Sequence, residues 1–334
     1  MGMNQDTPYF SILFPAYNAQ DTVARALDSV LVQDFDDWEL IAVDDGSTDG
    51  TLEILEKYAL KDDRFRVVSQ KNLGVGAARH RAQELSSGHF LMNFDADDVM
   101  DEHLLSVMKR CIINNPRYDF YSCNGFLTTY DSEGKIFSQR PYVSSPRFKG
   151  ETSLDLSDIM EEPYILSCGS AVSRDLIKKT GGYREGFRAE DFDFWVRAFL
   201  AGARHFYTPQ VLYLYTKGLK SQMNADQTLS YASFVESIDD ALSSPHLLSE
   251  EQRRILVQGR CHYLERTKQA YFEMSSVNEE LAFQSARFYA RLHKYLPASL
   301  AKIVYGIAYW MKKPIDPLRI ALARKKEERK SHEQ

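Results

Sequence analysis

The amino-acid sequence predicts an α/β fold in which helices flank a mostly parallel central sheet. Short apolar runs alternate with segments of helical periodicity through the first 130 residues, and this alternation is typical of a parallel sheet. Polar loops follow the apolar runs, as expected where strands give way to helices. With 334 residues, the chain is long enough for one large domain or two modest domains with a sizeable core.

The first half of the predicted sheet comes from four apolar runs separated by helical periods. The expected strands span residues 9–14, 39–43, 64–69 and 89–94. The expected helices between them span residues 23–31, 52–60 and 77–85. Because each apolar run is followed by a helix, consecutive strands are expected to run parallel.

The pattern changes after Asp119, where the strands are spaced less regularly. The expected elements are a strand, a turn, a loop, a helix and a second strand, at residues 120–131, 131–134, 138–152, 192–200 and 211–215. An apolar stripe at i, i+3, i+4, i+7 and i+8 defines the helix, which is expected to end at Gly202. From about residue 230 the chain is expected to be helical to its end, with breaks at prolines.

Composition narrows the class of protein. The four cysteines are scattered without metal-ligand or disulfide spacing, which favours a reducing compartment. The first residues lack the pattern of a signal peptide, so we expect a cytoplasmic protein, either free or peripheral on the inner face of the cell membrane. The net charge is −6, yet residues 287–334 hold twelve Lys and Arg against four Asp and Glu. The acidic body argues against binding nucleic acid, and the basic tail indicates an anionic surface as partner.

Asp95 and Asp97 follow the apolar run 89–94 and form the most informative pattern in the chain. An extended chain projects residues i and i+2 to the same side, so the two carboxylates are expected to point the same way. Two carboxylates held together repel unless a cation lies between them. Hard oxygen ligands, with no His or Cys nearby in the sequence, favour Mg²⁺ or Mn²⁺ carrying a substrate's phosphates. An acidic cluster that only caps a helix or solvates a turn is the alternative.

Four loops follow the four expected strands, at the edge where open α/β sheets bind ligands. In the first loop, Tyr17 is placed to lie against a base. Asp44 stands at the end of the second strand, where it can accept a hydrogen bond from the N–H of a base. The glycines of residues 72–79 permit close backbone approach, and Arg79 is placed to reach a phosphate. The acidic turn Asp95–Asp98 is the fourth loop.

The four loops contain the strings FPAYN, VDDGSTD, NLGVGAAR and DADD, in that order. Together they resemble the family 2 glycosyltransferases, which are nucleotide-sugar-dependent enzymes of the GT-A fold. The resemblance continues to about residue 216 and includes CGSAVSR at residues 168–174 and the acidic pair Glu190-Asp191.

This resemblance implies a division of the chain into a catalytic domain and an extension. The implied GT-A domain covers residues 1–225, with a donor-binding half at about 8–100 and an acceptor and base half at about 101–225. Residues 226–334 would form a helical C-terminal region. Its last part, 297–311, is too short for a membrane span but carries aromatic and Lys residues that suit a membrane interface. Packing on the catalytic domain or a homodimer contact is the alternative.

Roles for individual residues also follow from the resemblance. The residues implied to bind the nucleotide or its diphosphate are Pro15, Ala16, Tyr17, Asp44, Asp45, Asn72, Arg79 and Asp95. Asp95 and Asp97 would bind Mn²⁺ or Mg²⁺, Asp191 would act as the general base, and Glu190 would orient the loop. Asp98 and Asp193 are expected to be structural.

The chain departs from the family after the last expected strand. Family members often carry an Arg or His there that closes over the diphosphate, whereas this chain offers Lys217 and Lys220, between which the sequence does not decide. His205 lies before that strand and is expected to be a surface or core residue.

The expected activity is sugar transfer from a nucleoside diphosphate, with UDP implied, to a hydroxyl of a growing surface glycan or lipid-linked glycan. One base without a protein nucleophile predicts a single displacement with inversion at the anomeric carbon. Two alternatives are a nucleotidyltransferase and a non-catalytic protein that binds sugar nucleotides. A nucleotidyltransferase usually needs a glycine-rich basic loop after the first strand, which FPAYN does not provide. A non-catalytic protein would be expected to have lost DADD or the Glu190-Asp191 pair, yet both are present.

Overall fold

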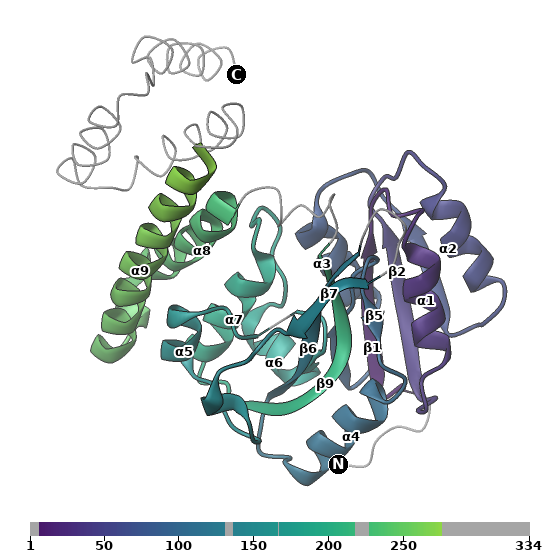
Figure 1. Ribbon diagram of the computed structural model, residues 1–334. Coiled ribbons are helices and arrows are strands. Elements are labelled where there is room, and N and C mark those ends of the chain that lie inside the picture. Colours follow the sequence, from purple (N-terminus) through teal and green to yellow (C-terminus); the bar gives the residue numbers. More distant parts are fainter. Residues whose placement is uncertain (1–6, 131–135, 166, 218–226, 276–334) are drawn as a thin grey trace. The chain divides into compact units, whose positions relative to one another are not determined.

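The computed structural model describes residues 7–130, 136–165, 167–217 and 227–275 (Figure 1). Its parallel half contains four strands in the order β3-β2-β1-β4. These strands are β1 (Phe10–Ala16), β2 (Trp38–Asp44), β3 (Phe65–Ser69) and β4 (Phe90–Asn93). The helices that connect them are α1 (Val23–Leu31), α2 (Thr51–Ala59) and α3 (Val75–Leu85). Helices α1 and α2 lie on one face of these strands and α3 on the other, and all seven elements confirm the predicted alternation.

The other half of the sheet is mixed. Its strands are β5 (Val99–Met100), β6 (Phe120–Tyr130), β7 (Ile136–Pro141), β8 (Ser170–Ser173) and β9 (His205–Lys217). Strand β8 runs antiparallel to both β4 and β6, and β6 and β9 run parallel. Strand β5 pairs antiparallel with β9, and β7 pairs antiparallel with β6. The α/β fold class is therefore confirmed, with the parallel order confined to the first half and to the β6–β9 pair.

Several elements were not predicted or were predicted differently. The unpredicted helices are α4 (Leu104–Asn114), α5 (Leu156–Glu161) and α6 (Arg174–Thr180), and a 3-10 turn covers Pro146–Phe148. The loop predicted at 138–152 is wrong over its first four residues, which belong to β7. All six residues of β7 are exposed, so the strand lacks the alternation by which a strand is recognised in sequence. The turn predicted at 131–134 lies outside the described residues.

Helices α7 (Glu190–Leu200), α8 (Gln227–Leu242) and α9 (Glu250–Ser275) form a layer beside the sheet (Figure 1). The rings of Phe192 and Phe234 stack with centroids 4.3 Å apart, which joins α7 to α8. Tyr263 on α9 donates its hydroxyl to the carbonyl oxygen of Ile159 on α5 at 2.6 Å. Helices α8 and α9 belong to the same compact unit as the sheet.

The basic tail and segment 297–311 lie outside the described residues, so the membrane and dimer predictions stay predictions. Among the residues that are described, no helix combines the length and apolar character needed to cross a bilayer. His205 is a core residue, as one of the two predictions had it. Leu154 N donates to His205 Nδ1 at 3.2 Å, His205 Nε2 lies 2.8 Å from Ser122 Oγ, and burial lowers the pKa of His205 to about 3.

Candidate active site

The first three predicted loops meet at one edge of the sheet because β1, β2 and β3 are parallel neighbours. Ala16 and Asp44 are paired in register at the ends of β1 and β2. Asp45 N donates to the carbonyl oxygen of Ala16 at 2.8 Å, and Gln70 N donates to that of Asp44 at 2.9 Å. The predicted donor-binding residues of these loops therefore lie at neighbouring strand ends.

Asp44 and Asp45 are both buried and organise the loops around them. Asp44 accepts the hydroxyl of Ser69 on Oδ2 at 2.9 Å and the backbone N–H of Ser47 on Oδ1 at 3.3 Å. Asp45 accepts the backbone N–H groups of Leu73 at 3.0 Å and Gly74 at 2.8 Å. Asp45 thus fixes the third loop, and Asp44 links the ends of β2 and β3; its predicted hydrogen bond with a base stays a prediction.

The exposed side chains of this edge are those that a planar base could contact. Pro15 and Ala16 are buried in β1, whereas Tyr17 is 43% exposed and Asn72 is exposed. Gly46 has φ +74°, and a Cβ there would lie 2.7 Å from the backbone nitrogen of Asn72. Only glycine lets the second and third loops approach this closely.

The acidic turn concentrates negative charge beyond the end of β4. Burial, and then the neighbouring charge of Asp95, raise the pKa of Asp97 to about 6. Asp98 is fully buried, and burial together with Asp97 and Asp95 raises its pKa well above the ordinary range. Thr216 N donates to Asp98 Oδ1 at 2.8 Å, but Oδ2 has no hydrogen-bond partner among the residues described. Such crowding of carboxylates fits a bound cation.

The donor atoms near this turn fit a hard divalent ion. One oxygen each from Asp95 and Asp98 and the sulfur of Cys168 lie within 4.8 Å of one another. Burial raises the pKa of Cys168 well above its ordinary value, so its thiol is protonated and is a poor ligand. Oxygen ligands then dominate the cluster, as Mg²⁺ and Mn²⁺ prefer. The positions of Asp98 and Cys168 were not predicted, because sequence spacing does not reveal them.

Arg79 on α3 joins the acidic turn to the segment that carries the predicted base. Its side chain is 4% exposed, donates to Asp95 Oδ1 at 2.5 Å and forms a second ion pair with Glu190, which is 5% exposed. Burial alone would lower the pKa of Arg79, but the charges of Asp95 and Asp191 outweigh it and the pKa is raised. The predicted contact of Arg79 with a diphosphate stays a prediction, because the guanidinium is already bound by two carboxylates.

Asp191 lies in the first turn of α7, far in sequence from the loops that follow β1 to β3. In space it is close enough to Arg79 for its charge to act on the guanidinium. Its side chain is half-buried, and its Oδ1 accepts the backbone N–H of Phe192 at 2.7 Å. Burial raises the pKa of Asp191, and Arg79 opposes that rise. A carboxylate with a raised pKa holds a transferred proton better, which suits a general base.

Close contact between α3 and the start of α7 brings these residues together. A Cβ on Gly76 would lie 2.8 Å from the carbonyl oxygen of Arg184 and 3.4 Å from Glu190 Cβ. The site thus depends on glycine at this crossing. Of the two lysines proposed to replace the usual Arg or His, the side chain of Lys217 and all of Lys220 lie outside the described part of the chain.

Comparison with known proteins identifies the family. The family model for glycosyl transferase family 2 matches residues 11–181. The putative glycosyltransferase EpsH of Bacillus subtilis is 34% identical over 145 residues, which cover 42% of this chain and 41% of EpsH. Chondroitin synthase of Escherichia coli is 40% identical over 94 residues, or 28% of this chain and 14% of that one. This chain therefore spans less than half the length of either relative.

Solved structures support the same conclusion for the fold. The structure of S. aureus TarS 1-349 in complex with UDP matches with a TM-score of 0.56 and 25% identity, covering 74% of this chain and 69% of that one. The complex of the same protein with UDP-GlcNAc matches with a TM-score of 0.63 and 24% identity, covering 83% and 79%. The sheet, the acidic turn and the family match agree, and this chain belongs to glycosyl transferase family 2.

Proposed function

We propose that this glycosyltransferase moves a sugar from a UDP-sugar to a hydroxyl of a growing surface glycan, by a single displacement that inverts the anomeric carbon. The observation that carries the proposal is the Arg79 cluster, which joins Asp95 of the acidic turn to Glu190, the residue before Asp191. One arginine thereby contacts Asp95, which we propose holds the cation, and Glu190, which precedes the proposed base Asp191. The UDP expectation comes from the family resemblance, and it is supported by TarS, which shares this fold and is bound to UDP and to UDP-GlcNAc in its solved structures.

In this proposal the chain's residues divide the work between donor and acceptor. Asp44 and Tyr17 hold the base, and Asp95 and Asp97 hold a Mn²⁺ or Mg²⁺ ion. When bound, that ion would supply positive charge for the departing diphosphate. Asp191 accepts the proton of the acceptor hydroxyl as its oxygen attacks the anomeric carbon. Arg79 holds Asp95 and the segment that carries Asp191 at a fixed separation. This matters for the rate, because a displacement of about 1 Å between reacting groups can cost roughly a hundredfold.

The direct test is a panel of UDP-, GDP- and dTDP-sugars incubated with the full chain, Mn²⁺ and water. A transferase without its acceptor hydrolyses its donor slowly, releasing the nucleoside diphosphate and the free sugar. We expect the wild type to hydrolyse a UDP-sugar and to stop when Mn²⁺ is chelated. Hydrolysis by the Asp97→Ala variant should no longer depend on Mn²⁺. Release of pyrophosphate from a nucleoside triphosphate and a sugar phosphate would instead indicate a nucleotidyltransferase. Binding of the donors without turnover of any of them, even with added glycan acceptors, would indicate a non-catalytic protein.

A further inference from the structure

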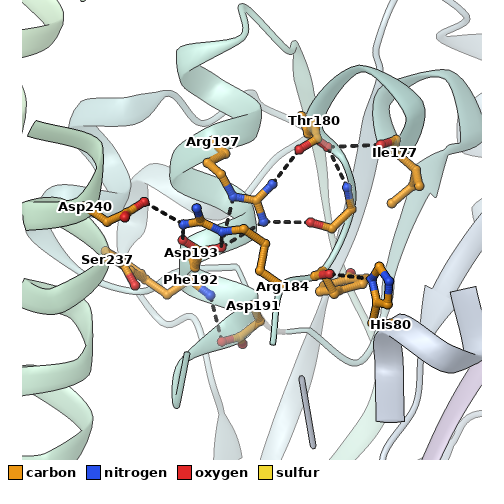
Figure 2. A network of polar contacts seen from close by, with 12 residues as sticks. His80, Ile177, Thr180, Arg184, Asp191, Phe192, Asp193, Arg197, Ser237 and Asp240 are labelled. Atoms are coloured by element: carbon orange, nitrogen blue, oxygen red, sulfur yellow. Dashed lines mark hydrogen bonds and ion pairs between the residues drawn. The ribbon is translucent and has the colours of Figure 1, made fainter. Parts of the chain in front are cut away.

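A second buried ion-pair network, separate from the Arg79 cluster, lies on α7 and the loop before it, close to the predicted base Asp191 (Figure 2). At its centre is Asp193, whose side chain is 1% exposed. Arg184 binds it with both arms of its guanidinium, with Nε 3.0 Å from Asp193 Oδ2 and Nη2 on Oδ1. Arg197 adds Nε at 2.9 Å and Nη2 at 2.8 Å to the same Oδ2. Asp193 is thus a buried carboxylate held by two arginines.

The two arginines tie the loop before α7 to the helix itself. Arg184 belongs to the loop at residues 181–189, and Arg197 lies one turn after Asp193 on α7. Arg197 also donates to the carbonyl oxygens of Thr180 at 2.8 Å and Gly182 at 2.7 Å, where α6 ends. Figure 2 shows these bonds converging on the start of the loop. The network therefore ties the start of this loop, and Arg184 within it, to α7.

The other side of the loop is held by the donor-binding half. His80 Nδ1 lies 2.9 Å from the carbonyl oxygen of Tyr183, so this nitrogen carries the proton and donates. Tyr183 N donates to Gln83 Oε1 at 3.1 Å, and Asn93 Nδ2 donates to the Tyr183 hydroxyl at 2.7 Å. The loop is thus fixed to α3 and β4 on one side and to α7 on the other.

Asp193 and Asp191 lie on opposite sides of α7. Successive residues of an α-helix are rotated by about 100°, so Asp191 and Asp193 project about 200° apart, on nearly opposite sides of α7. In Figure 2 Asp191 points away from the two arginines, toward its contact with Phe192 N. The first turn of α7 has no side-chain cap, so no capping side chain holds its position. The Asp193 network holds this turn on the side of α7 opposite Asp191, in addition to the ion pair of Arg79 with Glu190.

We propose that Asp193, Arg184 and Arg197 are positioning residues that fix where the carboxylate of Asp191 lies relative to the donor. This inference rests on the proposed function, because it takes Asp191 as the base. A bidentate guanidinium–carboxylate pair fixes both distance and orientation, which a lysine at the same place does not. The network acts on the transfer step and leaves the donor-binding loops of β1 and β2 unchanged.

Arg184→Lys is the variant that tests this inference. It keeps the positive charge of a side chain that is 34% exposed, so the protein is expected to fold, but it removes the two-point contact with Asp193. Asp240→Asn is the matched control. Asp240 on α8 is 45% exposed and accepts from the same arginine at 2.8 Å, so its replacement removes one contact of Arg184 and leaves the Asp193 pair intact. Asp193→Asn is the stronger perturbation and is measured in parallel.

The assay uses the full chain with the UDP-sugar that the wild type hydrolyses in Mn²⁺. For Arg184→Lys we expect kcat to fall about tenfold to a hundredfold, with the Kd for the donor from calorimetry within twofold of wild type. Hydrogen exchange at residues 188–193 should become faster in the same variant. Asp240→Asn should keep kcat within twofold and the exchange rate unchanged.

Each outcome discriminates between the two proposals. If the wild type hydrolyses no donor, the proposed function fails, whatever the variants do. If the wild type is active and a folded Arg184→Lys matches it in kcat, the positioning role is wrong. An equal loss of kcat in Asp240→Asn would also overturn it, because that variant keeps the Asp193 pair. If Asp193→Asn does not fold, Arg184→Lys still decides the question.

Discussion

Removing the guanidinium of Arg79 should destabilise the protein through the buried acid that it leaves behind. Arg79→Met keeps the length of the side chain but leaves Glu190, which is 5% exposed, without its ion-pair partner. Asp95 also loses a partner at 2.5 Å, but its side chain is 30% exposed and can be hydrated. The cost is therefore expected to come chiefly from Glu190.

The magnitude follows from the burial of this pair. Breaking a buried ion pair by removing one partner costs about 3–5 kcal/mol, because an uncompensated charge stays in the interior. For a domain of this size, each kcal/mol lowers the melting temperature by about 2–4 °C, so a decrease of roughly 10 °C is expected. Adding Glu190→Gln to Arg79→Met removes the stranded charge, and the double variant should regain part of the loss.

Urea unfolding in a chelating buffer measures this effect without interference from metal ions. The urea midpoint should decrease in Arg79→Met and recover in part in the double variant, with an unchanged slope m. The control is Lys57→Met, which breaks an exposed ion pair with Glu53 and should shift the midpoint little. A loss below about 1 kcal/mol in Arg79→Met, or no relief from Glu190→Gln, would refute the claim that this pair is a buried structural link.

Two further predictions concern the metal site and the helix crossing. In the metal-free protein the raised pKa of Asp97 gives stability that is present below the ordinary Asp value and is lost as the pH rises through about 6. Added Mn²⁺ should therefore raise the melting temperature more at pH 7.5 than at pH 5, and equal shifts at both pH values would contradict the site. Gly76→Ala places a Cβ 2.8 Å from the carbonyl oxygen of Arg184 and should cost about 1–3 kcal/mol in urea unfolding. Gly150→Ala, with no atom within 4 Å of its Cβ, is the control, and equal stability of the two variants would refute the close crossing.

The parallel half of the fold could be predicted because each of its elements has a distinct local pattern. A buried parallel strand is an apolar run, and the helix after it shows an apolar stripe, so β1 to β4 and α1 to α3 were found near their observed bounds. The second half could not be predicted to the same extent. Strand β7 is exposed throughout, so it has no alternation of apolar and polar residues. Strand β5 has only two residues, which is too short for any period to be recognised.

The roles of the candidate site residues stay predictions. Asp95 and Asp97 were proposed from their spacing and Asp191 from its place in the acidic pair, whereas the structure forms a turn at residues 96–97 and groups Asp95 with Asp98 and Cys168. The ion pair of Arg79 with Glu190 joins residues 111 positions apart and depends on the close approach at Gly76, which the sequence does not reveal. Asp193 was expected to be structural, and its ion pairs with Arg184 and Arg197 were not predicted.

The measurement that tests the central claim most directly is the effect of Asp191→Asn on turnover and donor binding in the same preparation. The amide cannot accept the proton of an attacking hydroxyl, whereas the loops that hold the nucleotide are unchanged. We predict that Asp191→Asn binds the UDP-sugar and Mn²⁺ with a Kd within about threefold of wild type. Its kcat should fall by about 10²-fold to 10⁴-fold, which is the contribution typical of a general base. A folded Asp191→Asn that turns over donor at the rate of the wild type would contradict the assignment of Asp191 as the base.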